Sequence, residues 1–144
     1  MTSDDDYAPS PEKWVRDHVE TIEQAGDTRA TDLKGLPIIV LTMRGVTSGK
    51  VRKVPLMRVE HDGRYAAVAS QGGAPENPKW YANIVADPDI EIQDGTERTP
   101  VRARELSGEE RYEWWLRAVE AYPPYADYQV RTQRQIPVFV LEPR

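Results

Sequence analysis

The organisation of the chain depends on one stretch, Ser70–Tyr81, which reads Ser-Gln-Gly-Gly-Ala-Pro-Glu-Asn-Pro-Lys-Trp-Tyr. It follows the apolar run Tyr65–Ala69, which is typical of a buried strand. It leads into a predicted helix over residues 77–86, with Asn77 as the N-cap and Pro78 as the first helical residue. The stretch is therefore a glycine-containing turn between a strand and the N-terminus of a helix.

Such a turn offers hydrogen-bond donors. Gly72 and Gly73 allow positive φ and close approach of another group to the backbone. Free N–H groups at a helix N-terminus favour anionic or polar ligands, and the rings of Trp80 and Tyr81 follow directly. The turn suits a flat polar ligand, although from this stretch alone a plain turn with Trp80 in the core is the favoured interpretation.

The composition indicates a single globular domain of 144 residues, with a net charge of -5 that argues against general nucleic-acid binding. The chain has no cysteine, and its two histidines, His18 and His61, lie in an amphipathic segment and a turn-like His-Asp-Gly. We therefore predict no metal site, and for an enzyme we expect a bound organic cofactor to supply the reactive atom. Neither a signal peptide nor a membrane span is predicted, so a cytoplasmic location is expected.

Three regions are predicted. Residues 1–9 are acidic and polar and are expected to be disordered, and residues 10–35 form an amphipathic helix and a linker. Helical spacing of apolar residues begins near Ser10 and ends at Gly26. Packing of this helix on the body is favoured, with weak adhesion to the inner face of the membrane as the alternative. Residues 36–144 form the main domain.

The main domain is predicted to be mostly β-sheet with peripheral helices. His61-Asp62-Gly63 is predicted to join the second and third strands into a hairpin. A capping box at Ser107 begins a helix that extends to about Ala121, with an apolar side formed by Tyr112, Trp115, Leu116 and Val119. Short turns between strands favour antiparallel pairing and a small β-barrel. The expected strands are Pro37–Thr42, Val51–Glu60, Arg64–Ser70, Ile90–Gln93, Thr99–Glu105 and Ile136–Leu141.

A group of basic residues stands out in this acidic chain. With the side chains of Thr47 and Ser48 and the Gly49 N–H, it suits a phosphate or carboxylate. Basic residues also protect exposed edge strands from aggregation, and the two interpretations have equal weight. The group comprises Arg44, Lys50, Arg52, Lys53 and Arg58.

Three tyrosines, Tyr122, Tyr125 and Tyr128, recur every three residues around a Pro-Pro pair. On a helical turn they form an aromatic wall with hydroxyl tips, which suits an apolar ring carrying polar groups. The same pattern is common at the edge of a core.

Taken together, three segments in this order resemble the deazaflavin-dependent nitroreductases of actinobacteria, which are quinone reductases that use coenzyme F420. The resemblance covers roughly residues 36–143. The segments are Leu41–Arg52, then Ala69–Gly73 with Asn77–Asn83, then Tyr122–Gln129 with Arg134–Val138.

The resemblance implies a split β-barrel of the FMN-binding, pyridoxamine-phosphate-oxidase-like type and hydride transfer from reduced coenzyme F420 to a quinone or nitroaromatic acceptor. Catalytic roles fall to Ser70, Tyr125 and Tyr128, and Tyr122 joins Tyr125 and Tyr128 in binding the acceptor. The residues expected to bind the coenzyme are Val46, Thr47, Ser48, Arg52, Lys53, Val54, Pro55, Leu56, Met57, Ala69, Ser70, Gln71, Gly72, Gly73, Lys79, Trp80, Tyr81, Asn83 and Tyr125.

The chain departs from the family pattern at two points. Val46-Thr47 replaces an Arg-Lys pair and Gln71 replaces a lysine, so the coenzyme tail should be held less tightly than its ring. Two alternatives follow. An FMN enzyme of the same fold would not need the missing cations, and a non-catalytic carrier would bind a lipid or quinone in the aromatic pocket without any coenzyme. The oligomeric state is not predicted.

Overall fold

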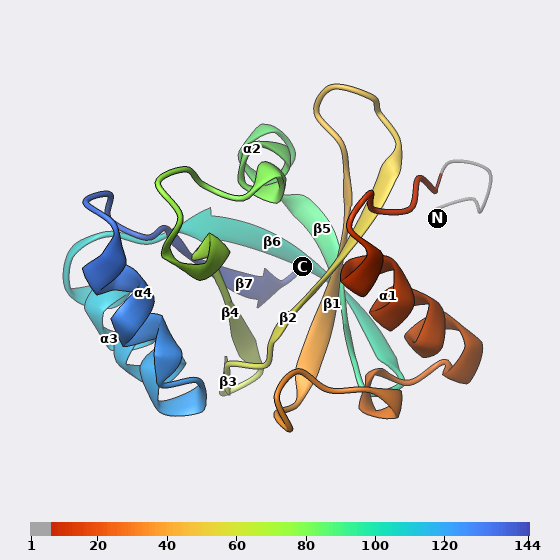
Figure 1. Cartoon of the computed structure of the whole chain (residues 1–144), viewed down its shortest axis with the longest axis horizontal. Helices are drawn as coiled ribbons and strands as arrows, with labels where there is room; N and C mark the ends of the chain where they lie inside the picture. Colours follow the sequence, from red (N-terminus) through yellow and green to blue (C-terminus); the bar gives the residue numbers. More distant parts are fainter. Residues whose placement is uncertain (1–6) are drawn as a thin grey trace.

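The computed structural model describes residues 7–144. Its centre is a seven-stranded sheet in the order β2-β1-β5-β6-β7-β4-β3, in which every neighbouring pair is antiparallel. Figure 1 shows the strongly twisted sheet with α1 on one side and α3 and α4 on the other. The strands are β1 (Ile38–Arg44), β2 (Val51–Met57), β3 (Glu60–His61), β4 (Arg64–Val68), β5 (Asp89–Asp94), β6 (Glu97–Glu105) and β7 (Val138–Pro143).

The two edges of this sheet are joined by only two residues. The chain leaves edge strand β2 at Met57 and, after Arg58 and Val59, enters the opposite edge strand β3. A sheet whose edges are joined so closely must curl, which produces a partly closed barrel. The predicted hairpin between Val51–Glu60 and Arg64–Ser70 is therefore wrong for most of its length. Only Glu60 and His61 pair with β4, while β2 pairs with β1.

The core has two main parts because the strands alternate their side chains between two faces. On β7, Phe139 and Leu141 face the interior cluster that also includes Trp80 and Ile84. The neighbouring Val138 and Val140 face a second cluster under α3 (Gly108–Ala121) and α4 (Pro124–Arg131).

The first helix packs on the body, as favoured from the sequence. It spans Lys13–Ala25 and ends at Gly26, whose φ is 68°. Val15, Val19 and Ile22 are buried, and Ile22 packs against Ile38 and Val40 of β1. A short 3-10 turn, η2 (Thr28–Ala30), leads from it toward β1. Of the tail expected over residues 1–9, residues 1–6 lie outside the described part. Tyr7 and Ala8 lie beside Val51 of β2.

One predicted helix start differs from the structure, and a second is in the predicted place but lacks the predicted capping bond. Helix α2 spans Lys79–Ala86 with Pro78 as its N-cap, because the side-chain oxygen of Asn77 accepts a hydrogen bond from Arg134 instead. Ser107 is the N-cap of α3, but its side chain makes no capping hydrogen bond.

Only half of the apolar side predicted for α3 packs on the core. Trp114 and Ala118 are the buried residues, whereas Tyr112 and Leu116 are exposed. Trp115 and Val119 are half-buried and pack against the cluster. Because aromatic residues occupy several sides of this helix, periodicity alone could not identify the packed one.

Candidate active site

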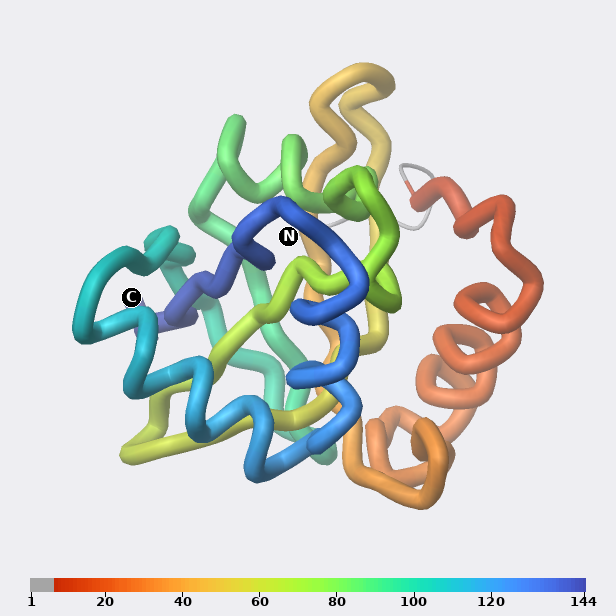
Figure 2. Tube along the Cα trace, turned by 60° about the vertical axis from the view of Figure 1, so that its left-hand side comes forward, coloured from red at the N-terminus to blue at the C-terminus, as the bar shows by residue number. Residues whose placement is uncertain are grey.

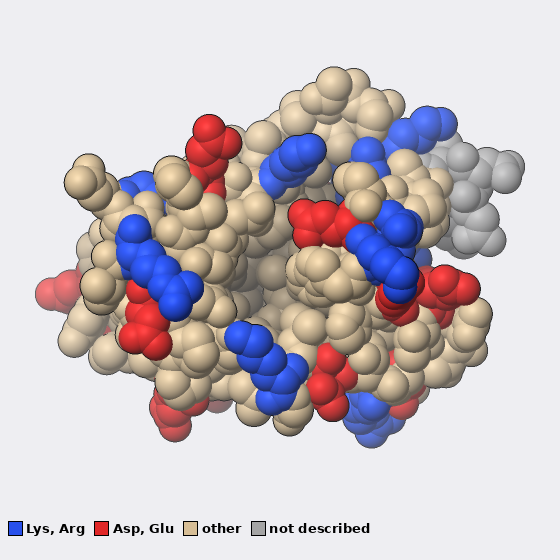
Figure 3. Space-filling model, in the orientation of Figure 1, with Lys and Arg blue, Asp and Glu red and all other residues tan. Residues whose placement is uncertain are grey.

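A cleft of about 1050 Å³ opens between α1, β2, the glycine turn, α2 and α4. Figure 3 shows a hollow at the centre of the face seen in Figure 1, with Lys and Arg side chains on several sides of it. All the predicted site residues except Ala69, Gly73 and Tyr81 line this cleft. A second hollow, of about 440 Å³, lies beside Arg29, Arg58 and Asp94 and contains none of them.

The loop between β1 and β2 forms one end of the cleft. The Gly45 N–H donates to the Lys50 carbonyl at 2.7 Å, and the Gly49 N–H donates to the Gly45 carbonyl at 2.9 Å. The prediction that the Gly49 N–H can donate to a bound anion is therefore wrong, because this N–H already donates to a carbonyl within the loop. The Asn83 side-chain oxygen accepts from the Val46 N–H at 2.8 Å and attaches the loop to α2.

Arg52 and Lys53 lie on edge strand β2, where both interpretations of the basic group apply. Arg52 donates from Nη1 to the carbonyls of Ala8 and Pro9, at 3.1 Å each. Lys53 Nζ pairs with the Glu23 carboxylate of α1 at 2.6 Å, and the exposed fraction of the Lys53 side chain is 12%. The N-terminal segment thus contacts both of the cations predicted to hold an anion.

The glycine turn has an unusual backbone. Gln71, Gly72 and Gly73 all have positive φ, at 48°, 63° and 81°, within the short turn η3 (Gln71–Gly73). A Cβ atom at Gly73 would lie 2.6 Å from the carbonyl oxygen of Tyr128, so only glycine fits there. At Gly72 a Cβ would meet no atom within 4 Å. Gly73 therefore lets the turn contact α4, and Gly72 faces the cleft.

Arg134 holds this turn in place. Its guanidinium donates to the carbonyls of Ala69, Ser70 and Ala74 and to the side chain of Asn77, at distances of 2.7–3.1 Å. In Figure 2 the segment that follows α4 runs across the strand-to-helix turn. One planar cation thus fixes both ends of the stretch that the sequence places at the centre of the site.

The three tyrosines lie on α4 and at its start, and they form one wall of the cleft. The Tyr122 and Tyr128 hydroxyls are 2.8 Å apart, and Lys34 Nζ donates to the Tyr122 hydroxyl at 3.0 Å. Burial alone would raise the pKa of Tyr122, but the hydrogen bonds of Tyr128 and Lys34 and the positive charge of Lys34 lower it. Burial next to the other two tyrosines raises the pKa of Tyr125, which stays neutral.

Two hydroxyl groups face the cleft without a partner among the described residues. Ser70 and Tyr125 are both nearly buried, at 9% and 5% exposure, and both line the cleft. No described side chain donates to or accepts from either hydroxyl, and no fully buried side-chain oxygen lacks a partner in the described part. Both oxygens must therefore open to the cleft, where they can bind a ligand.

Three predicted residues support the site from behind. Tyr81 donates its hydroxyl to Glu105 at 2.8 Å and packs its ring on Phe139. Ala69 is fully buried, and Gly73 contacts α4. Trp80 belongs to the interior cluster, as the alternative interpretation expected, and also forms part of the cleft wall.

The sequence did not indicate the contribution of the N-terminal region. Glu12, Trp14, Leu33 and Lys34 all line the cleft, and the Trp14 indole donates to Glu12 at 2.8 Å. The one available signal was Lys34-Gly35, a turn-like pair preceding the first strand. No pattern connects it with a tyrosine 88 residues later.

Within residues 7–144, no helix is long and apolar enough to cross a membrane. The same residues contain no group of three or more metal-ligating side chains that could hold an ion. Weak membrane association of α1 stays a prediction.

A curled antiparallel sheet with a glycine turn, a basic loop and an aromatic wall around one large cleft defines a split-barrel protein built to hold a flat organic cofactor. The chain belongs to the F420H(2)-dependent quinone reductase family, whose model matches residues 14–143. The family expected from the sequence is thereby confirmed, together with its coenzyme.

Individual relatives agree with this assignment. A Mycobacterium tuberculosis protein provisionally named as an F420H(2)-dependent quinone reductase is 41% identical over 77% of this chain and 93% of its own length. A solved structure described as an F420-H2 dependent reductase matches with a TM-score of 0.71 and 58% identity, covering 74% of this chain and 94% of that one. Another, described as a domain-swapped dimer, matches with a TM-score of 0.73 and 53% identity over 92% of this chain and 100% of that one.

The fold prediction is confirmed as well. The two solved relatives share the architecture, and a distant structure from Listeria innocua, described in terms of pyridoxamine 5'-phosphate oxidase, has a TM-score of 0.50 at 15% identity. At that identity the likeness shows the fold alone.

Proposed function

We propose that this protein reduces a quinone with coenzyme F420 in the cleft, with a nitroaromatic ring as an alternative acceptor. The observation that carries the proposal is the meeting, in one cleft, of the glycine turn, the basic end at Arg52 and Lys53, and the hydroxyl wall at Tyr122–Tyr128. The family match to a quinone reductase supports it.

The residues of the cleft fit such a coenzyme. The volume of about 1050 Å³ suits a tricyclic ring with a polar side chain, and Pro55, Leu56 and Met57 supply an apolar wall. Gly72 allows close backbone approach, and the cations at the other end of the cleft suit an acidic tail. When bound, the reduced deazaflavin supplies a hydride.

The side chains of this chain have three tasks. The walls hold the two rings face to face and exclude water from the space between them. The hydroxyls of Ser70 and Tyr125 donate to the acceptor oxygen, where negative charge develops as the hydride arrives. Arg52 and Lys53 hold the anionic tail, for which Arg52 exchanges the carbonyls of Ala8 and Pro9 for the ligand.

Anaerobic mixing of the protein with reduced coenzyme F420 and a soluble benzoquinone tests the proposal. We expect saturable, enzyme-dependent return of the oxidised coenzyme's absorbance with one quinol formed per coenzyme. A carrier would bind the quinone without turnover, and an FMN enzyme would turn over only with reduced FMN. Either result would remove the proposal.

Arg52→Ala provides a site-specific check. Loss of one charged hydrogen bond should weaken coenzyme binding by about 1.5–3 kcal/mol. Arg102→Ala, which removes a cation paired with Asp89 outside the cleft, is the matched control and should bind normally. Added salt should weaken coenzyme binding in the wild type more than in Arg52→Ala.

A further inference from the structure

Lys34 has a backbone conformation that its residue type does not favour. It lies with Gly35 at the tip of a tight turn in which Leu33 and Leu36 exchange backbone hydrogen bonds of 3.1 and 3.0 Å. Both tip residues have positive φ, 53° for Lys34 and 77° for Gly35. Asparagine and glycine favour this geometry, and a lysine there is strained. The turn itself requires positive φ, so the choice of lysine over asparagine or glycine directs attention to its side chain.

The lysine side chain reaches the tyrosine wall from this turn. Its ammonium group lies 3.0 Å from the Tyr122 hydroxyl and 5.6 Å from the centre of the Tyr122 ring. An ammonium group can only donate, so the Tyr122 oxygen must accept this bond. Tyr122 can then donate its own proton to Tyr128, 2.8 Å away, which leaves the Tyr128 proton free for the cleft.

We propose that Lys34 is a positioning residue for quinone reduction, which orients and polarises the Tyr122–Tyr128 hydroxyl pair toward the acceptor. A cation at the outer end of the pair strengthens the hydrogen bond that Tyr128 offers, because successive hydrogen bonds polarise one another. The inference rests on the proposed function. The quinone gains two electrons and one proton as a hydride, the deazaflavin is oxidised, and the second proton comes from solvent through the hydroxyl pair.

Within residues 7–144, no acidic side chain contributes to the pKa of either hydroxyl of the pair. Among the described residues, Lys34 reaches the hydroxyl pair from the turn, Tyr125 of α4 packs against both rings, and the guanidinium carbon of Arg131 lies 5.5 Å from the centre of the Tyr128 ring. Lys34 favours negative charge on the Tyr122 end of the pair, whereas burial and the bond to Tyr122 raise the pKa of Tyr128, so the two hydroxyls are not equivalent. The lowered pKa of Tyr122 agrees with this arrangement.

Lys34→Asn separates a functional role from a structural one. Asparagine suits the positive φ of the turn, so the variant should melt at the same temperature as the wild type or higher. We expect kcat with benzoquinone to fall by about tenfold, less than for loss of a direct donor to the oxyanion, with coenzyme affinity unchanged. Lys34→Arg should recover most of the rate. Lys13→Asn, at an exposed lysine outside the cleft, should not alter kcat.

A second readout needs no coenzyme. Alkaline titration of tyrosinate absorbance in the free protein should show one tyrosine ionising below the usual range. This low-pH ionisation should be absent in Tyr122→Phe, and its pKa should be higher in Lys34→Asn than in the wild type. Identical titration curves for wild type and Lys34→Asn, or an unchanged kcat in the variant, would overturn the proposal. A wild type that never reduces quinones would remove the proposed function instead, while the titration still decides whether Lys34 polarises the pair.

Discussion

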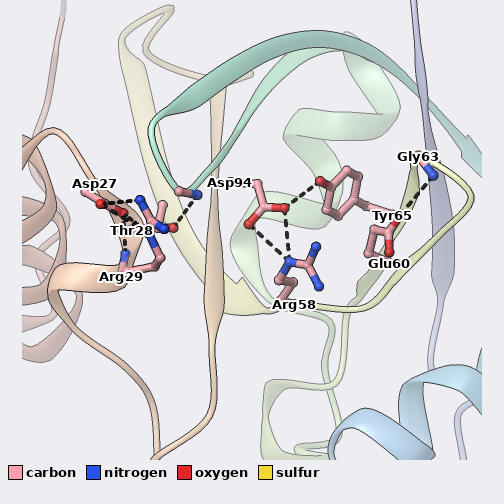
Figure 4. A network of polar contacts seen from close by, with 9 residues as sticks. Asp27, Thr28, Arg29, Arg58, Glu60, Gly63, Tyr65 and Asp94 are labelled. Atoms are coloured by element: carbon pink, nitrogen blue, oxygen red, sulfur yellow. Dashed lines mark hydrogen bonds and ion pairs between the residues drawn. The ribbon is translucent and has the colours of Figure 1, made fainter.

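Two polar networks in this molecule combine a cation with tyrosine hydroxyls, and they have opposite properties. At the cleft, Lys34 donates to Tyr122, which is bonded to Tyr128. Outside the cleft, Arg58 and Tyr65 both donate to the carboxylate of Asp94, as Figure 4 shows, at 3.0 Å and 2.6 Å. Only the second network contains a carboxylate.

The presence or absence of a carboxylate determines whether the pKa of the tyrosine is raised or lowered. Partial burial and the bond to Asp94 raise the pKa of Tyr65 to about 12. The pKa of Tyr122 is lowered, because its partners stabilise its charged form. The Asp94 network is internally neutralised and ties strands β4 and β5 to the segment after β2, whereas the Lys34 network keeps a positive charge and faces a ligand cleft. We expect the Asp94 network to contribute to stability and the Lys34 network to contribute to activity.

Gly73→Ala should have the largest effect, because it forces apart the turn and the helix that carries Tyr128. Positive φ and a Cβ 2.6 Å from a backbone oxygen together should lower the free energy of unfolding by about 2–4 kcal/mol. Gly72→Ala, with a similar φ but open space, is the matched control and should lose about 1 kcal/mol. Urea unfolding of both variants measures this. Equal losses would show that α4 does not depend on the close approach at Gly73.

Asp94→Ala should break the stabilising network alone. Loss of the charged hydrogen bonds from Arg58 and Tyr65 should cost about 1.5–3 kcal/mol of unfolding free energy. Coenzyme affinity and kcat should remain near wild type, because Asp94 lies outside the cleft. Reduced turnover in a variant of normal stability would contradict the division between the two networks.

Tyr125→Phe and Tyr128→Phe should lower activity and leave stability almost unchanged, the reverse of Asp94→Ala. Loss of a hydroxyl that donates to a developing oxyanion lowers kcat or raises the acceptor KM, while coenzyme affinity is kept. Stability should change by about 1 kcal/mol or less. Steady-state kinetics with a soluble quinone, run beside thermal melts, decides the matter. Wild-type kinetics in both variants would show that these tyrosines only pack and do not contact the acceptor.

The last of these predictions concerns alkaline stability. The pKa of Tyr65 is about 12 when folded and about 10 when unfolded, so the unfolded chain loses its proton first as pH rises. The contribution of Tyr65 is therefore fully present below about pH 10 and is lost between about 10 and 12. Wild type minus Tyr65→Phe, measured by urea unfolding across this range, should show the decline. A difference independent of pH would mean that Tyr65 has an ordinary pKa.

The sequence predicted the barrel, the first helix and most of the cleft, because these depend on local patterns: alternation in the strands, the turn at Asp62-Gly63, and the motif segments. It failed where the structure depends on contacts distant in sequence. The edge-to-edge passage through Arg58 and Val59 looks like one continuous strand until the sheet curls. Likewise, the engagement of Asn77 by Arg134 and of Tyr122 by Lys34 depends on tertiary structure alone.

Parallel titration of the purified protein with coenzyme F420 and with FMN, followed by tryptophan fluorescence, would show directly which ring the cleft binds. Trp80 lines the cleft and should report occupancy by either ring. We predict saturable quenching by coenzyme F420 that weakens with salt and in Arg52→Ala, and much weaker quenching by FMN. Tight binding of FMN without binding of coenzyme F420, or no response to either, would contradict it.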